Sequence, residues 1–446
     1  MGSGHAGPLA HRKEQRMDLQ RRTRSVQTFF RQRRESLEFC DVRDPRDLRG
    51  KRWRAQVLLE TAVVTLMLLA KSLRRSEALS DELASGGRIP GLHRRISDST
   101  MGDFLSQVSP ADIAHHLHAQ ILDEHRRKAL EPTVLPIRSI AIDGKTNATL
   151  DEKWNRDCQK QSAAGEPDRY EYRMVNVALI SSAAAVCIDR LAIPASTNDM
   201  GVFTAAYKRI KRTYGRANLF ELVSTDAGFT SENNARLVDD DGKAYWMALK
   251  GNQPELHRRA WRLLTAQSLR ESPEAETPWE LDSTRGWIRR RLWRTTRMKG
   301  FGKWSHLRQV VLIETIQAAG DPRRHHGPER ILEKHFYLTN LPVGRLDGVQ
   351  LIQLMRAHWR IENDFHGSLD IQWQEDHGLW VRRGKGLPVV GLLRAIAYNL
   401  LALMRTVHLR SVEARAIQWQ SLRDLMRDAM LWPDLTTGKA MSIFLA

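Results

Sequence analysis

Residues 137–146, with the sequence IRSIAIDGKT, contain the pattern that decides the fold. Apolar side chains fill the first part of this stretch, which predicts a buried β-strand that ends at the carboxylate of Asp143. A second apolar run, residues 219–224, predicts a short strand that leads to Asp226. An acid followed by a small residue often only caps a turn, so neither motif alone indicates function. Two such acids, each after a strand that we expect to neighbour the other, indicate a functional site more strongly than either acid alone.

The segments around these strands alternate between strand and helix patterns. The further predicted elements are strands over 170–180 and 184–193, a helix over 199–214, a helix over 231–238 and a strand over 244–249. The resulting order, β-β-β-α-β-α-β, is typical of a mixed α/β sheet. We therefore expect an α/β fold with a carboxylate after its first and fourth strands.

The two carboxylates indicate a metal site. Burying like charges together is costly unless a cation compensates them, so Asp143 and Asp226 predict a divalent-metal site. Lys250 and Gln253 follow the strand over 244–249 and are candidates to hold a substrate phosphate, although a plain turn explains them almost as well.

A predicted helix over residues 349–369 offers a third acid. The spacing i, i+4 and i+8 predicts one shared face for His358, Glu362 and His366, with Asp370 a further turn along. Two alternatives stay open: a polar face that makes its own ion pairs, and a His-Glu-His metal site on this helix alone. The reserve candidates for the third carboxylate are Glu375 and Asp376.

Composition indicates a polyanionic partner. The 446 residues hold 70 Lys and Arg against 52 Asp and Glu, a net charge of +18, which favours nucleic acid first and an acidic membrane surface second. Three cysteines exclude a disulfide framework and fit a reducing compartment. The most apolar run, residues 57–70, carries Glu60 and is shorter than the about 20 residues of a membrane span. We expect no signal peptide and a cytosolic protein.

The chain divides into five predicted segments. In order they are a basic, partly disordered arm over 1–45, a helical N-terminal domain over 46–130, the first part of an α/β core over 131–253, a strand-rich insertion over 254–345, and a long helix with a helical C-terminus over 346–446.

One segment of the insertion is typical of a DNA-binding surface. Residues 284–304 carry eight Lys and Arg and no Asp or Glu, with aromatic residues interleaved. Positive charge follows a phosphate backbone and aromatic faces stack on unpaired bases, which makes candidates of Trp287, Arg289, Arg290 and Arg291. The alternative is an amphipathic strand pair whose tryptophans face the core.

Taken together, these segments resemble the ISAs-type DDE insertion-sequence transposases, which include the H-repeat-associated proteins. The motifs that carry the resemblance are AIDGKT at 141–146, STNDM at 196–200, TDAG at 225–228, ALKGNQ at 248–253, FYLTNL at 336–341, RAHWRIEN at 356–363 and SLDIQWQED at 368–376. The resemblance covers residues 40–410. The sequence RGWIR at 285–289 departs from the His-Gly-Arg-Ile-Glu-like run that is common in this branch.

The resemblance implies an RNase H-like fold in which Asp143, Asp226 and Glu362 are catalytic and hold two Mg²⁺ ions, for which Mn²⁺ can substitute. It implies cleavage and strand transfer on double-stranded DNA, at the element ends and the target, by a homodimer. Lys145, Lys250 and Arg360 are secondary candidates for phosphate contacts. We expect a cytoplasmic, nucleoid-associated prokaryotic enzyme with no membrane partner. A domesticated DNA-binding protein and a metal-dependent nuclease that cuts without joining remain alternatives.

Overall fold

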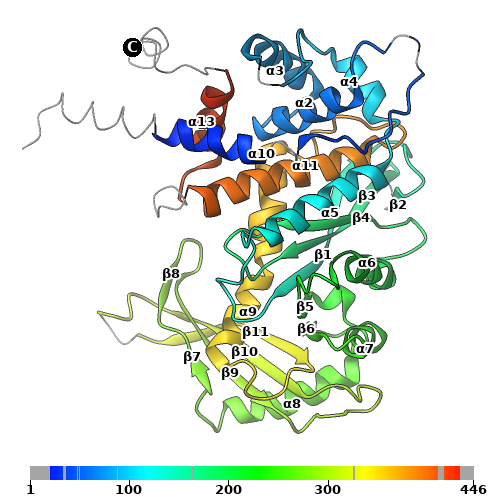
Figure 1. Ribbon diagram of the computed structural model, residues 1–446. Helices are drawn as coiled ribbons and strands as arrows, with labels where there is room; N and C mark the ends of the chain where they lie inside the picture. Colours follow the sequence, from blue (N-terminus) through cyan, green and yellow to red (C-terminus); the bar gives the residue numbers. More distant parts are fainter. Residues whose placement is uncertain are drawn as a thin grey trace, which may run out of the picture. The chain divides into compact units, whose positions relative to one another are not determined.

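The computed structural model describes residues 21–33, 37–47, 49, 51–87, 89–162, 165, 167–324, 327–409 and 416–431. These residues form two compact units (Figure 1). The sheet unit consists of Leu130–Lys145 and Arg173–His366, and the helical unit contains the described residues up to Ala129, those within Thr146–Tyr172 and those from Gly367 onward. Residues 1–20 of the predicted basic, partly disordered arm over 1–45 lie outside the described residues.

A mixed β-sheet forms the sheet unit, as the alternating pattern predicts. The strand order is β3-β1-β5-β6-β11-β10-β9-β7, with β4 paired to β3 and β8 to β9. The strands of its first part are β1 (Ser139–Leu150), β3 (Arg169–Leu179), β4 (Cys187–Ala192), β5 (Leu222–Thr225) and β6 (Ala244–Leu249). The neighbours β1, β5 and β6 run parallel, and β3 and β4 are antiparallel.

The first strand is longer than predicted. β1 continues past Asp143 to Leu150, so the prediction that it ends at Asp143 is wrong. Its ladder with β5 nevertheless ends at the pair Ile142 and Thr225. Asp143 therefore lies where this pairing stops, although the strand itself goes on.

Helices α6 (Asp199–Tyr214) and α7 (Glu232–Asp240) lie side by side, and α7 packs next to β6 (Figure 1). Each begins at a polar side chain that accepts a hydrogen bond from the backbone of the first turn, Asn198 for α6 and Ser231 for α7. One face of α6 is buried, including Phe203, because apolar residues recur there at helical spacing. These caps and faces are local signals, and both helices were predicted.

The strand-rich insertion extends the same sheet. It contains α8 (Pro254–Ser268), β7 (Ala275–Glu276), β8 (Glu280–Asp282), β9 (Gly286–Thr295), β10 (Gln309–Ala318) and β11 (Glu329–Thr339). β11 pairs antiparallel with β6 from Phe336 opposite Leu249 to Thr339 opposite Trp246. The predicted segment over 254–345 thus belongs to the sheet unit, because long-range strand pairing joins it to the core.

The predicted long helix is interrupted. It consists of α9 (Gly348–His358), the π-helical segment η3 (Ile361–His366) and α10 (Gly367–Trp373). A π-helical turn is wider than an α-helical turn, so residues four apart no longer stack on one face. The prediction of one shared face from His358 to Asp370 therefore fails.

The helical unit contains α2 (Ala55–Met67), α3 (Leu73–Gly86), α4 (Asp98–Leu105) and α5 (Pro110–Arg126), which lie within the predicted helical segment over 46–130. Residues 21–32 are also helical, with Val26 and Phe29 buried, so this part of the predicted arm is ordered. The unit also contains β2 (Gln159–Gln161), α11 (Gly386–Leu403), the π-helical η4 (Met404–His408) and α13 (Trp419–Leu431).

In the described part of the chain, the helix over Gly386–His408 is long and apolar enough to cross a membrane, judged by length and composition alone. Its apolar window is 94% buried inside the fold. Core helices of soluble proteins pass the same test, so this helix is weak evidence for a membrane span.

Candidate active site

Asp143 lies beside Asp226 at the edge where the β1–β5 ladder stops. The parallel register pairs Ile142 with Thr225, so the next residue of each segment is one of the two acids. Asp143 is 8% exposed, and the backbone N–H of Gly144 donates to its Oδ1 over 2.9 Å. Burial, and then the negative charges of Asp226 and Glu362, raise the pKa of Asp143 to about 8.

Asp226 directly precedes a short 3-10 turn, Ala227–Phe229. Its Oδ1 is buried and, among the described residues, has no hydrogen-bond partner. Burial raises the pKa of Asp226, even though the backbone N–H groups of Gly228 and Phe229 act in the opposite direction. A buried carboxylate oxygen that no donor satisfies suits a bound cation.

Glu362 lies in η3 and keeps an exposed surface. Enough protein nonetheless surrounds its carboxylate that partial burial, and then the charge of Asp226, raise its pKa, while Lys250 lowers it. The three predicted acids therefore interact electrostatically within the sheet unit, although they come from three separate elements.

A fourth acid, Asp199, was not predicted. Its charge also raises the pKa values of Asp143 and Asp226. It differs from the other acids because Arg173 donates to both of its carboxylate oxygens, over 3.0 and 2.9 Å. A side chain at position 144 would overlap its carboxylate, which explains the glycine in the DGK motif. The STNDM motif at 196–200 could have indicated Asp199 from the sequence. Nothing in the sequence indicated that Arg173 is its partner.

His366 contacts Asp143, which the sequence did not indicate. Its Nδ1 lies 3.6 Å from Asp143 Oδ2, and its Nε2 lies 2.9 Å from Asn176 Nδ2. Arg190 Nε donates to Asn176 Oδ1 over 2.7 Å, and an arginine can only donate. The amide of Asn176 therefore turns its NH₂ group to His366 Nε2. This arrangement leaves the proton on Nδ1, which faces Asp143.

His358 has a structural role. It is buried in the sheet unit with its Nδ1 2.9 Å from Ser224 Oγ. Burial alone lowers its pKa to about 4, so the ring is neutral. The alternative of a His-Glu-His metal site on one helix is therefore not supported.

The carboxylates fit a hydrated metal ion better than a fully coordinated one. Among the residues that the structure describes, no group of three His, Cys, Asp or Glu side chains is close enough to hold a metal directly. Mg²⁺, however, keeps several waters and takes only one or two carboxylates. Oxygen donors, uncompensated like charges and the unsatisfied Asp226 Oδ1 all suit such an ion.

Glu375, the reserve candidate, belongs to the helical unit. It is 2% exposed, accepts a hydrogen bond from Asn147 Nδ2 over 2.6 Å and lies 3.6 Å from Arg394 Nη1. Asp376 lies 3.2 Å from His377 Nε2 at the surface. Buried and compensated, Glu375 has the environment of a structural ion pair.

The structure separates the candidates for phosphate contacts. Lys250 is exposed, and its charge lowers the pKa values of Asp226 and Glu362, so it acts on the carboxylate cluster. Gln253 Nε2 donates to the carbonyl of Thr230 over 3.2 Å, as expected for the plain-turn alternative. Lys145 is half-buried after Gly144 in β1.

Arg360 is not available to a phosphate. Its guanidinium donates to the carboxylate of Asp364 over 3.0 Å and to three backbone carbonyls, those of Ile180, Ser182 and Ala183, over 2.7 to 2.9 Å. These bonds use its donors to hold the loop after β3. The prediction of a phosphate contact at Arg360 is therefore corrected to a structural role.

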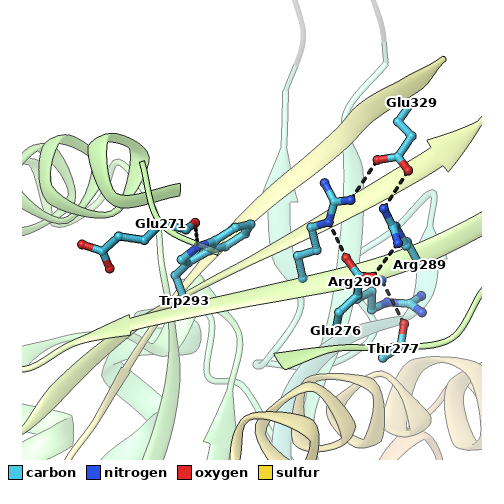
Figure 2. A network of polar contacts seen from close by, with 8 residues as sticks. Glu271, Glu276, Thr277, Arg289, Arg290, Trp293 and Glu329 are labelled. Carbon is cyan, nitrogen blue, oxygen red and sulfur yellow. Dashed lines mark hydrogen bonds and ion pairs between the residues drawn. The ribbon is translucent and has the colours of Figure 1, made fainter. Parts of the chain in front are cut away.

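The arginines of β9 are compensated by glutamates. Figure 2 shows Arg289 between Glu276 of β7 and Glu329 of β11, and the same two glutamates also pair with Arg291. Arg290 is buried and pairs with Glu280. That these three side chains bind DNA stays a prediction, but strand pairing brings acids beside them that the local sequence lacks.

The aromatic residues of this segment follow the amphipathic alternative. Trp293 and Trp304 are buried, and Trp293 Nε1 donates to the carbonyl of Glu271 over 3.1 Å (Figure 2). Trp287 is half-buried beneath the guanidinium of Arg323, 4.3 Å from the ring centre. Two of these tryptophans therefore contribute to the core rather than to a stacking surface.

This chain is similar in sequence to a curated protein. The chain is 22% identical over 185 residues to YncI of Escherichia coli O157:H7, whose name describes it as a candidate transposase. That match covers 40% of this chain and 45% of the relative. The chain thus spans less than half the length of this relative.

A solved structure, that of the piggyBac transposase synaptic complex with hairpin DNA, covers 89% of this chain and 76% of its own. It has a TM-score of 0.41 and 10% sequence identity, values too low to support an argument from fold.

The family described as Transposase DDE domain matches residues 135–400, more than half of the 446-residue chain. Asp143, Asp226 and Glu362 all lie inside the matched region. By this match, the chain belongs to the family of transposase DDE domains.

Proposed function

We propose that this protein is a metal-dependent DNA transposase, of the ISAs type that its motifs resemble, with an RNase H-like core. One observation carries the proposal: within a transposase DDE domain, burial raises the pKa values of Asp143, Asp226 and Glu362, and the charge of Asp226 adds to the shift at both Asp143 and Glu362. Such a cluster is costly unless a bound cation offsets the repulsion.

These three acids would hold two Mg²⁺ ions, or Mn²⁺ in their place. The bound ions would activate the attacking hydroxyl and offset negative charge at the scissile phosphate and its leaving oxygen. Lys250, exposed beside the cluster, would attract the incoming phosphate. His366 would keep its protonated Nδ1 beside Asp143, 3.6 Å from Oδ2. The Arg173–Asp199 pair would keep Gly144 close and the backbone there in place.

The proposed substrate is double-stranded DNA, at the ends of an insertion element and at its target. The excess of positive charge supports a nucleic-acid partner. Joining two DNA ends requires two active sites, which supports a homodimer on DNA. We place the protein in the cytoplasm, associated with the nucleoid.

The test is cleavage and strand transfer on labelled DNA that carries the flanking element ends, with and without Mg²⁺. Wild type is compared with Glu362→Ala and with Glu255→Gln, a control at an exposed glutamate in the first turn of α8. Activity that is lost only in Glu362→Ala supports the proposal. An active Glu362→Ala variant would overturn the assignment of Glu362.

Two other outcomes identify the alternatives. A wild-type protein that binds the ends without cutting them would be a domesticated DNA-binding protein. Hydrolysis without joining would identify a nuclease.

A further inference from the structure

A basic recess lies at the C-terminal end of α6, away from the carboxylates. Its volume is about 960 Å³, and we define it by the residues that line it with charge: Lys208, Lys211, Arg212, Arg216, Lys243 and Asp241. Five cations and one acid therefore face a single concave surface of the sheet unit.

The ion pairs inside the recess leave most of this charge uncompensated. Lys211 pairs with Asp241, and Lys243 Nζ donates to Asn218 Oδ1 over 3.3 Å. Lys208, Arg212 and Arg216 are exposed, and within the described residues none of them makes an ion pair. This contrasts with β9, where each arginine from Arg289 to Arg291 has a glutamate partner.

The spacing concentrates the three unpaired cations on one side. Lys208, Arg212 and Arg216 are four residues apart, so they follow one another along one face of α6 and the turn after it. Like charges at this spacing destabilise a helix. Cations near the C-terminus of a helix interact favourably with the helix dipole, but the five cations of the recess are more than this interaction needs.

The recess is remote from the chemistry. Asp199, which acts on the carboxylates, is the first residue of α6, and Tyr214 is the last. Sixteen residues of α-helix are about 24 Å long. A phosphate held at Arg212 and Arg216 is therefore not the scissile phosphate.

The chemistry favours a polyanion over a small anion. Small phosphates bind where backbone N–H groups converge, as at a helix N-terminus. Here the helix presents its C-terminal carbonyl groups, and the positive charge comes from five long side chains, all exposed except that of the half-buried Lys243. Such side chains suit the repeated charge of a DNA backbone.

We propose that the basic recess binds the phosphate backbone of a double-stranded DNA segment outside the active site. This inference rests on the proposed function for its choice of DNA. It gives the protein a second point of contact with DNA that the catalytic residues do not provide.

The test compares two double variants that remove the same net charge, Arg212→Gln/Arg216→Gln and Arg126→Gln/Arg127→Gln. Arg126 and Arg127 are exposed but share Asp123, over 3.3 and 2.6 Å. DNA affinity is measured from 50 to 300 mM salt. Each phosphate contact contributes about 0.9 to the slope of log affinity against log salt, so the recess variant should lower the slope by about 2. The control variant should lower it by much less.

Equal slopes for the two variants would overturn the inference. A second result would also overturn it: wild type binds inorganic phosphate saturably in calorimetry, Arg212→Gln/Arg216→Gln abolishes that binding, and the variant leaves the salt slope of DNA affinity unchanged. This result would identify a small-anion site. Circular dichroism checks that both variants are folded. A wild type that binds DNA but lacks strand transfer would overturn the proposed function while leaving the slope comparison intact.

Discussion

The carboxylate cluster and the insertion sheet are both rich in charge, but they differ in compensation. On β9, Arg289 and Arg291 each pair with Glu276 of β7 and Glu329 of β11, as Figure 2 shows for Arg289. In the cluster, burial, and then the negative charges of Asp226 and Glu362, raise the pKa of Asp143 to about 8. Compensated charge holds a fold together, whereas uncompensated charge of one sign requires something from outside the chain.

The comparison also revises which cations are candidates for DNA. Residues 284–304 have the composition most typical of a DNA-binding segment, yet strand pairing neutralises their central arginines. The end of α6 has a weaker signal in the sequence, yet Arg212 and Arg216 remain exposed there without an ion pair among the described residues.

The largest expected effect is loss of catalysis in the cluster. We expect Asp143→Ala, Asp226→Ala and Glu362→Ala each to lower the rate of strand transfer by on the order of a thousandfold, with DNA affinity nearly unchanged. Single-turnover assays on labelled element ends measure the rate. A loss of less than tenfold in any one variant would remove that residue from the site.

The next effect concerns pH and the buried His358. Its pKa is lowered from 6.5 to about 4 in the folded protein. Because the pKa of His358 is lower in the folded protein than in the unfolded chain, this residue stabilises the fold at pH values above 6.5. That stabilisation is lost as the pH falls towards 4. We expect the free energy of unfolding to fall by about 3 kcal/mol over this range because of His358.

Urea unfolding between pH 7 and pH 4 measures this effect. His358→Gln should remove part of the pH dependence, and His377→Gln, at an exposed histidine, should retain it. Identical pH profiles for His358→Gln and wild type would refute the assignment.

A third prediction is that divalent metal stabilises the protein through the cluster. At a Mg²⁺ concentration a hundred times the Kd, the gain is about 2.7 kcal/mol. The pKa of Asp143 is raised to about 8 in the folded protein. Without metal, protonation of Asp143 therefore stabilises the fold at low pH, and this stabilisation is lost as the pH rises towards 8. Metal displaces that proton, so the gain should be largest near pH 8.

Thermal unfolding with and without Mg²⁺ measures the gain. Asp143→Asn should abolish it, whereas Glu255→Gln, at an exposed site, should not. A gain of equal size in Asp143→Asn would locate the metal elsewhere.

In the insertion sheet the expected effects are on stability. Glu280→Gln leaves Arg290, which is 5% exposed, without its partner. Because the side chain of Glu280 is 33% exposed, we expect a cost of about 2 kcal/mol, below that of a fully buried pair. The double variant Glu280→Gln/Arg290→Gln should recover part of this loss in urea unfolding. A Glu280→Gln variant as stable as wild type would show that the pair contributes nothing.

The smallest expected effect tests the comparison directly. We expect Arg289→Gln/Arg291→Gln to leave the salt dependence of DNA affinity almost unchanged, because Glu276 and Glu329 already compensate both arginines. A fall of about 2 in the slope, as large as that expected for the recess variant, would mean that the glutamates release these arginines to phosphate.

Local patterns were enough for much of this fold. The strand over Ala244–Leu249 and the helix over Asp199–Tyr214 were predicted with their observed bounds, because alternation and helical spacing are properties of consecutive residues. The proximity of Asp143 and Asp226 was also predictable, because parallel strands place their carboxyl ends at one edge.

Other features depend on partners far away in the chain. The continuation of β1 past Asp143 and the π-helical turn at Glu362 have no local signature in the sequence. His366 acquires its tautomer from Asn176, 190 residues away, and from Arg190, which fixes the amide.

The sequence by itself determined an α/β chain with excess positive charge and two acids at the end of a strand ladder, because these follow from composition and short-range periodicity. Only the tertiary structure decided which charges are balanced. Asp199 is paired by Arg173, and Arg289 by Glu276 and Glu329, while among the described residues no Lys or Arg makes an ion pair with Asp143, Asp226 or Glu362. Electrostatic energy depends on distance in space, which the order of residues does not contain.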